Sequence, residues 1–115
     1  MSRRTHSRVA ARQRMHALVF AALGNSTRLS LVARLARGQR RSISELTQGC
    51  KLTRQAVTKH LRVLESAGIV QSIHAGRESL FEFNLAPIAE VSDYLGYVSG
   101  QWDEALSRLK AFVED

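Results

Sequence analysis

The spacing of apolar residues in the middle of the chain predicts two helices followed by two strands. Ser42 and Glu45 have the spacing of a capping box, which places the start of one helix at Ser42. Thr53 can cap the next helix, and Gly68 can end it. Between them, residues recur every three or four positions and so predict one buried stripe: Ala56, Val57, His60, Leu61 and Leu64. From Gly68 to Leu85, two runs of β-branched and aromatic residues flank a short glycine-containing loop, which predicts a β-hairpin.

Three more helices are predicted outside this region. The first ends at Gly24, which we expect to adopt the left-handed conformation of a helix cap. Asn25 caps the second, which Gly38 ends, and its expected inner face consists of Leu29, Val32, Leu35 and Ala36. The last helix runs from Pro87 to about Val113. The fold class is therefore mainly α with a small β-hairpin, a winged helix-turn-helix in the order α-α-α-α-β-β-α.

The last helix carries an unbroken a/d seam of apolar residues at alternating three- and four-residue spacing: Ile88, Val91, Leu95, Val98, Trp102, Ala105, Leu109 and Phe112. A domain of this size is too small to cover the whole seam, so we expect a second subunit to cover it. Gly96 and Gly100 either allow a neighbouring helix to approach closely or break this helix, and the sequence leaves both readings open.

Composition and length predict one small domain. The chain has 115 residues, 44% of them hydrophobic, and a single cysteine, which excludes an internal disulfide framework. It has no apolar run of membrane-spanning length, and its N-terminus lacks the apolar centre of a secretory signal, so we expect a cytoplasmic protein with no membrane partner. We divide the chain into a basic arm (residues 1–14), a winged helix-turn-helix (residues 15–85) and a dimerisation helix (residues 86–115).

The net charge of +7 is distributed unevenly along the chain. Residues 1–44 contain ten arginines and no acid, residues 45–85 contain five basic and four acidic residues, and residues 86–115 contain two basic and six acidic residues. A basic front end with an acidic tail is typical of a nucleic-acid-binding protein, although the same distribution can serve solubility alone. Residues 1–14 are rich in arginine and contain no acid, which predicts a mobile arm that reaches DNA. The same composition also resembles a transit peptide.

The exposed face of the helix over residues 53–67 is basic and lacks acids. With the wing at residues 74–79, it provides the candidate DNA-binding residues Arg54, Gln55, Thr58, Lys59, His60, Arg62 and Arg77. The first three lie on the early turns, where side chains reach base edges, whereas Lys59, Arg62 and Arg77 lie nearer to phosphates. His60 either supports the helix or touches phosphate. A solvated basic face is the alternative reading, because helix-turn-helix patterns are short and degenerate.

Two motifs at their present spacing resemble those of the ArsR/SmtB transcriptional regulators: FAALGNSTRL at residues 20–29 and VTKHLRVLESAGIV at residues 57–70. The resemblance extends from about Met15 to the C-terminus. It implies a homodimer formed through the first and last helices. The residues expected in the dimer interface are Leu18, Ile88, Val91, Leu95, Val98, Trp102 and Leu109.

The resemblance does not extend to the metal sites of that family. Its metal sensors often carry two cysteines in the helix that begins here at Ser42, and Thr47 and Gly49 occupy those places. A second site uses His and Asp on the last helix, where Asp93 has no histidine. We therefore expect no metal and no cofactor. Cys50 is expected at the last inward position of the Ser42 helix as a small buried hydrophobe, and Lys51 stands where such turns commonly have glycine.

The sequence predicts a DNA-binding regulator and not an enzyme, because it has no nucleophile motif and no glycine-rich phosphate loop. We expect a homodimeric repressor that binds an inverted repeat in double-stranded DNA and responds to an unknown inducer. Two alternatives stay open. A winged helix used as a protein-interaction module would show no salt-dependent DNA binding, and an architectural DNA-binding protein would bind without regard to sequence.

Overall fold

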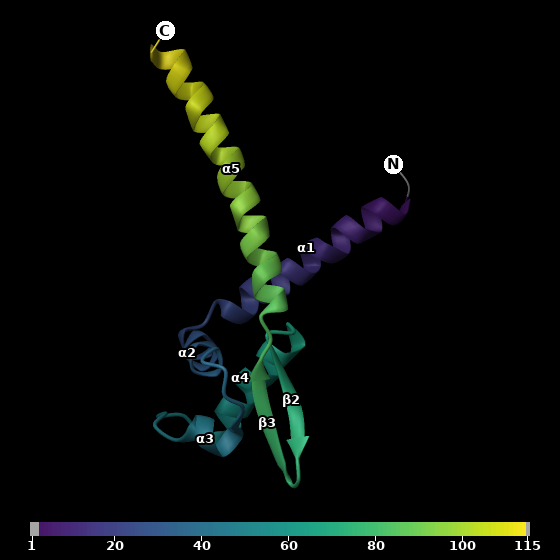
Figure 1. The fold of residues 1–115 in the computed structure, drawn as a ribbon, viewed down its shortest axis with the longest axis vertical. Coiled ribbons are helices and arrows are strands. Elements are labelled where there is room, and N and C mark those ends of the chain that lie inside the picture. Colours follow the sequence, from purple (N-terminus) through teal and green to yellow (C-terminus); the bar gives the residue numbers. More distant parts are fainter. Residues whose placement is uncertain (1–2, 115) are drawn as a thin grey trace.

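The computed structural model describes residues 3–114 and shows a small helical body beside a hairpin, with a long helix at each end of the chain (Figure 1). Its elements are α1 (Arg3–Leu23), α2 (Ser26–Leu35), β1 (Arg41–Ser42), α3 (Ile43–Thr47), α4 (Arg54–Ser66), β2 (Val70–Ala75), β3 (Glu78–Phe83) and α5 (Ala86–Glu114). The predicted fold class, mainly α with a winged helix-turn-helix, is confirmed. Within the described residues, no helix has the length and apolar character needed to cross a membrane.

The sheet has three antiparallel strands in the order β1-β3-β2, and β1 was not predicted. This strand has only two residues, with Arg41 opposite Phe81, so it is too short to show an alternating pattern. The predicted hairpin is confirmed, and β2 pairs with β3 from Val70–Phe83 to Ala75–Glu78. Its loop has two central residues, of which only Gly76 has a positive φ, at 64°. Glycine at the first central position is typical of a type II′ turn, which matches the twist of the paired strands.

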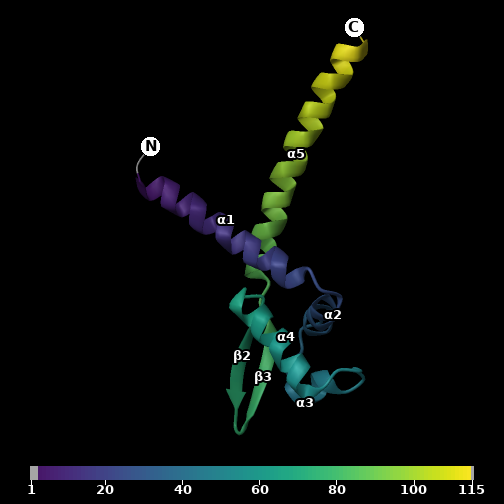
Figure 2. The ribbon, with the colours of Figure 1, turned by 180° about the vertical axis from the view of Figure 1, so that it is seen from behind.

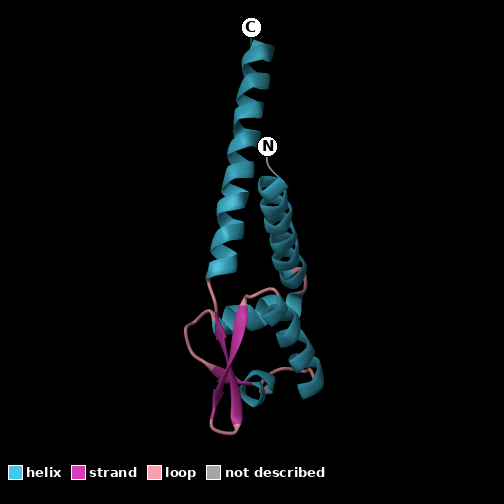
Figure 3. Cartoon of the chain, turned by 90° about the vertical axis from the view of Figure 1, so that its right-hand side faces the viewer, coloured by secondary structure: helices cyan, strands magenta, loops and turns pink. Residues whose placement is uncertain are grey.

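The core lies where α2, α3 and α4 meet the sheet and the near ends of the two long helices (Figure 3). Its largest fully buried side chains are Phe81, Leu35, Leu46, Leu61, Leu64, Ile69, Val19, Val57 and Val70. Three of these residues, Val57, Leu61 and Leu64, come from α4 and form the predicted stripe. Because this stripe is anchored in the core, the opposite side of α4 faces outward.

The predicted N-terminal caps are all present. Ser42 Oγ accepts a hydrogen bond from the backbone N–H of Glu45, and Glu45 Oε1 accepts one from the N–H of Ser42, both at 3.1 Å. Asn25 and Thr53 cap α2 and α4 through their side-chain oxygens. Gly68, with φ of 76°, follows α4 in the predicted left-handed conformation. These signals were predictable because each involves residues close together in sequence.

Two predictions around α1 and α2 were wrong. Gly24 does not have a positive φ, so α1 ends without a left-handed cap. Leu29 is 50% exposed, whereas Leu31 is 3% exposed and fills the core position together with Leu35. The helix has apolar residues on two sides, and spacing alone does not tell which side is buried.

The turn after α3 also differs from the prediction. The helix ends at Thr47, so Cys50 lies in the turn and not on the helix, and it is half-buried against the core. The left-handed residue of this turn is Gly49, with φ of 75°. Lys51 has an ordinary negative φ, so its position where glycine is common causes no backbone strain.

The two terminal segments of the chain, α1 and α5, are each one continuous helix. The expected mobile arm at residues 1–14 is instead helical from Arg3, and residues 1 and 2 lie outside the described part. At the other end, α5 continues unbroken through Gly96 and Gly100. The reading in which these glycines break the helix is therefore wrong.

Substitutions in α2 test the assigned core. Leu31→Ala should lower the free energy of unfolding by about 2–5 kcal/mol, because it leaves a cavity in a closed core. Leu29→Ala should change it by about 0.5 kcal/mol or less. Urea denaturation followed by circular dichroism measures both. An equal loss in the two variants would contradict the assigned packing.

Candidate nucleic-acid interface

The outward face of α4 brings four predicted DNA-binding residues together. Arg54, Gln55, Thr58 and Lys59 line one shallow hollow on the helix surface. The hydroxyl of Thr58 donates to the backbone oxygen of Arg54 at 2.8 Å, which fixes its direction on the helix. The side chains of Gln55 and Lys59 are exposed and make no hydrogen bond or ion pair within residues 3–114. Their polar groups are therefore available to an external partner.

Arg54 lines this hollow and also contacts α3. Its Nη1 donates a hydrogen bond to Ser44 Oγ at 2.9 Å. Arg54 therefore also lines a second, narrower cleft of about 190 Å³ between α3, α4 and the hairpin turn. Arg77, exposed in that turn, lines the same cleft, as do Ser44 and Ser79. The two serines were not predicted, because nothing in the local sequence shows that α3 and the turn lie together.

His60 supports α4 from the side of α1 and α2. It is half-buried, and its Nδ1 lies 3.3 Å from Nη1 of Arg28. The same guanidinium donates to the backbone oxygens of Ala22 at 2.6 Å and Ala21 at 3.2 Å, at the end of α1. Arg28 thus satisfies carbonyl groups at a helix end that has no left-handed cap. Of the two readings for His60, the structure favours support of the helix.

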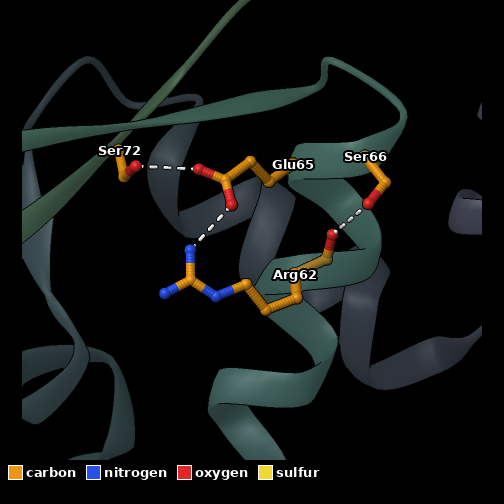
Figure 4. A network of polar contacts seen from close by, with 4 residues as sticks. All are labelled: Arg62, Glu65, Ser66 and Ser72. Carbon is orange, nitrogen blue, oxygen red and sulfur yellow. Dashed lines mark hydrogen bonds and ion pairs between the residues drawn. The ribbon is translucent and has the colours of Figure 1, made fainter.

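Arg62 is directed at the hairpin (Figure 4). Its Nη1 pairs with Glu65 Oε1 at 2.7 Å, and the other oxygen of Glu65 accepts the hydroxyl of Ser72 at 2.8 Å. The guanidinium carbon also lies 6.0 Å from the centre of the Phe81 ring, within the range of a cation–π contact. The hydrogen bonds from Arg62 and Ser72 lower the pKa of Glu65. This network joins α4 to β2 and gives Arg62 a role within the protein.

A second ion pair neutralises an acidic residue on the sheet. Glu82 accepts hydrogen bonds from Arg40, at 2.9 Å, and from Gln71. These bonds lower the pKa of Glu82, so it stays charged and paired at neutral pH. The carboxylate is therefore balanced by Arg40 in the strand region next to α4.

The two long helices cross at the body and diverge towards their free ends (Figures 1 and 2). Two residues predicted for the dimer interface contribute to the packing of the single chain, because Val91 is 5% exposed in the core and Ile88 packs half-buried against the core. Only the part of the seam beyond Val91 extends away from the helical body. Val98 is half-buried, and the other predicted interface residues are exposed: Leu18, Leu95, Trp102 and Leu109.

The crossing of α1 and α5 contains a buried histidine. His16 is 9% exposed, and its ring centre lies 5.1 Å from that of Tyr94. Around them is a cleft of about 570 Å³ whose other lining residues are Arg12, Glu90, Asp93 and Tyr97. Across the described part of the chain, no three His, Cys, Asp or Glu residues are grouped as metal ligands.

The fold and the exposed face of α4 define a winged helix-turn-helix protein of the DNA-binding regulator class. A family of helix-turn-helix domains matches residues 23–73. The HTH-type transcriptional regulator YuzN of Bacillus subtilis (strain 168) is 38% identical over 76 residues, which cover 61% of this chain and 83% of YuzN. An ArsR-like transcriptional regulator from Rhodococcus sp. RHA1 has a similar structure, with a TM-score of 0.79, 32% identity, and coverage of 87% of this chain and 93% of that one. The chain belongs to the ArsR family of transcriptional regulators.

A further structural match shows the fold alone. The winged helix-turn-helix domain of Mb0332 from Mycobacterium bovis, which is homodimeric, has a TM-score of 0.64 at 24% identity. The match covers 94% of this chain and 93% of that one, so it includes both long helices.

The network around Glu65 predicts a pH-dependent contribution to stability. The folded state lowers the pKa of Glu65 from its usual value of 4.5, so its contribution to stability is fully present above that value and is lost as the pH falls through the folded value. Glu65→Gln should therefore lower the free energy of unfolding by up to about 1 kcal/mol at neutral pH. The difference from wild type should shrink in acid.

Urea denaturation at pH 7 and pH 3.5 measures this difference. Asp103→Asn is the control, because Asp103 is exposed and has no ion pair within the described residues. Its effect should be small at both pH values. A Glu65→Gln deficit that stays constant across this range would refute the assigned charge interaction.

Proposed function

We propose that the protein is a homodimeric, sequence-specific DNA-binding repressor that binds an inverted-repeat operator through α4 and the hairpin. The observation that carries this proposal is the outward face of α4. It gathers basic and amide side chains in one hollow without an acid, on a helix whose opposite side is anchored in the core. Such a helix is suited to the major groove, where Arg, Lys and Gln side chains contact base edges and phosphates.

Within this face, Gln55 is the main candidate for reading bases. It lies on the first turn of α4, is exposed, and has both an amide donor and an acceptor available. Gln can contact adenine through two hydrogen bonds in the major groove. Thr58 lies one turn further on, and Lys59 carries a charge that suits phosphate. His60 and Arg62 contribute by holding α4 against Arg28 and the hairpin.

The dimer is supported by apolar side chains on the long helices that the single chain leaves exposed. Trp102 is 66% exposed, and Leu95 and Leu109 lie on the same seam. Their exposure on a 29-residue helix favours a second copy as the cover. A two-fold dimer presents two copies of α4 to one side of the duplex, which requires half-sites about one helical turn, or a multiple of it, apart. A dimer that occupies promoter DNA in this way excludes polymerase from it and so represses.

Replacing Gln55 tests whether α4 reads sequence. Gln55→Ala should weaken binding to an operator selected from random DNA by about 1–3 kcal/mol and relax the preference at one or two base pairs in each half-site. Fluorescence anisotropy with operator and random duplexes measures this effect. Lys59→Ala is the matched comparison, and it should weaken both duplexes alike and reduce the salt slope by about one per subunit. Equal affinity of the wild type for both duplexes would favour an architectural protein, and absence of salt-dependent binding would favour a protein-interaction module.

Charged substitutions in the seam test the dimer. Leu95→Glu or Trp102→Glu would bury an unpaired charge between subunits, at a cost of several kcal/mol. We expect monomers or aggregates in sedimentation at micromolar concentration. Ser107→Glu is the control, because Ser107 lies on the side of α5 away from the seam, and it should remain dimeric. A wild type that is already monomeric, or seam variants that remain dimeric, would overturn the assignment.

A further inference from the structure

We propose that the cleft between α3, α4 and the hairpin turn binds one backbone phosphate of each DNA half-site, held by Arg54 and Arg77 with the hydroxyls of Ser44 and Ser79. The inference rests on the proposed DNA-binding function and deepens it. It assigns Arg54 to the DNA backbone, although its place on the first turn of α4 predicts a base contact. It also adds two residues to the interface that neither motif indicates.

The size and lining of the cleft fit a small anion. Its volume of about 190 Å³ is below the range of about 300–1,000 Å³ that is typical of small-molecule pockets. Arginines line it from two separate elements, Arg54 from α4 and Arg77 from the turn between β2 and β3. Neither side chain forms an ion pair within residues 3–114. A phosphodiester oxygen bound in the cleft would therefore lie beside two positively charged residues that have no partner of opposite charge in this part of the protein.

The orientation of Arg54 is already set without DNA. Its hydrogen bond to Ser44 Oγ uses one of the five N–H donors of the guanidinium. The remaining donors keep the fork geometry that matches two phosphate oxygens. Because Ser44 accepts this hydrogen bond, its own hydroxyl proton stays available to donate to the same phosphate. Ser44 therefore both positions Arg54 and offers a further contact.

The type II′ turn places Arg77 on the other side of the cleft. Gly76 provides the positive φ that the turn requires, and the turn brings Arg77, Glu78 and Ser79 to the cleft wall. Glu78 is the one acidic lining residue, and its carboxylate opposes an incoming phosphate. Removing the charge of Glu78 should therefore strengthen DNA binding, whereas removing either arginine should weaken it.

A phosphate held in this way would join the wing to the helix-turn-helix. Phosphate contacts fix the register of a protein on the duplex without reading its sequence. With one phosphate bound by α3, α4 and the turn together, the direction in which α4 enters the groove is fixed relative to the backbone. Base recognition by Gln55 then depends on this placement.

Anisotropy titrations across a range of salt concentrations test the cleft. Arg54→Ala and Arg77→Ala should each weaken binding to operator and random DNA by a similar factor, about tenfold or more, and lower the salt slope by about one per subunit. The double variant should lose less than the product of the two single losses, because both side chains hold the same phosphate. Ser44→Ala and Ser79→Ala should weaken both duplexes by smaller factors. Glu78→Gln should tighten both.

Arg108→Ala is the matched control, because it removes one positive charge from the distal part of α5 and should leave the salt slope unchanged. Circular dichroism melting verifies that each variant is folded. Relaxed base preference in Arg54→Ala with an unchanged salt slope would overturn the proposal and place Arg54 at a base edge. Losses that simply multiply in the double variant would also overturn it, since the two arginines would then act at separate places.

A scan of single neutral methylphosphonates through the operator locates the contact. At one position in each half-site, the wild type should lose affinity while the Arg54→Ala, Arg77→Ala double variant loses little more. If every position weakens both proteins equally, the cleft does not hold a phosphate. These failures differ from failure of the proposed function, in which the wild type would not bind DNA in a sequence-specific, salt-dependent way.

Discussion

The guanidinium of Arg28 connects three helices through its polar contacts, and it adds to the buried apolar residues that hold α4 in place. It donates to the carbonyl oxygens of Ala21 and Ala22 at the end of α1, and its third nitrogen lies beside the imidazole of His60 on α4. A cation at this helix end also interacts favourably with the helix dipole. Arg28 belongs to the first family motif and His60 to the second, so this contact gives a physical reason for the two motifs to occur together.

The other side of α4 is held by the carboxylate of Glu65. It receives Arg62 from its own helix and Ser72 from β2, while Arg62 lies over Phe81 of β3. Helix α4 is thus held by α1 and α2 on one side and by the hairpin on the other. If its outward face binds DNA as we propose, the helix is already held in place, which lowers the entropic cost of binding.

Local features of the fold were predictable from sequence, and contacts between distant segments were not. The capping box at Ser42 and the stop at Gly68 each depend on neighbouring residues, so spacing and residue type were sufficient. The strand β1 exists only because Arg41 and Ser42 pair with β3, about 40 residues away. The spacing of apolar residues in α2 likewise could not show whether Leu29 or Leu31 is buried in the core.

The same distinction applies to the candidate site. The composition of the α4 face was evident from the sequence. The contacts of His60 with Arg28 and of Arg62 with Phe81 join distant elements, so the sequence could not show that both side chains also support the fold. The apolar seam on α5 was evident from its spacing in the sequence. It could not reveal that its first part, at Val91, packs into the core of the same chain while the later part remains exposed.

We propose that two copies of α4, held in fixed geometry, read DNA sequence. Selection of binding sites by the wild-type protein from a pool of random duplexes tests it most directly. We expect enrichment of an inverted repeat whose half-sites lie about one helical turn, or a small multiple of it, apart. Salt-dependent binding without any enriched sequence would contradict it.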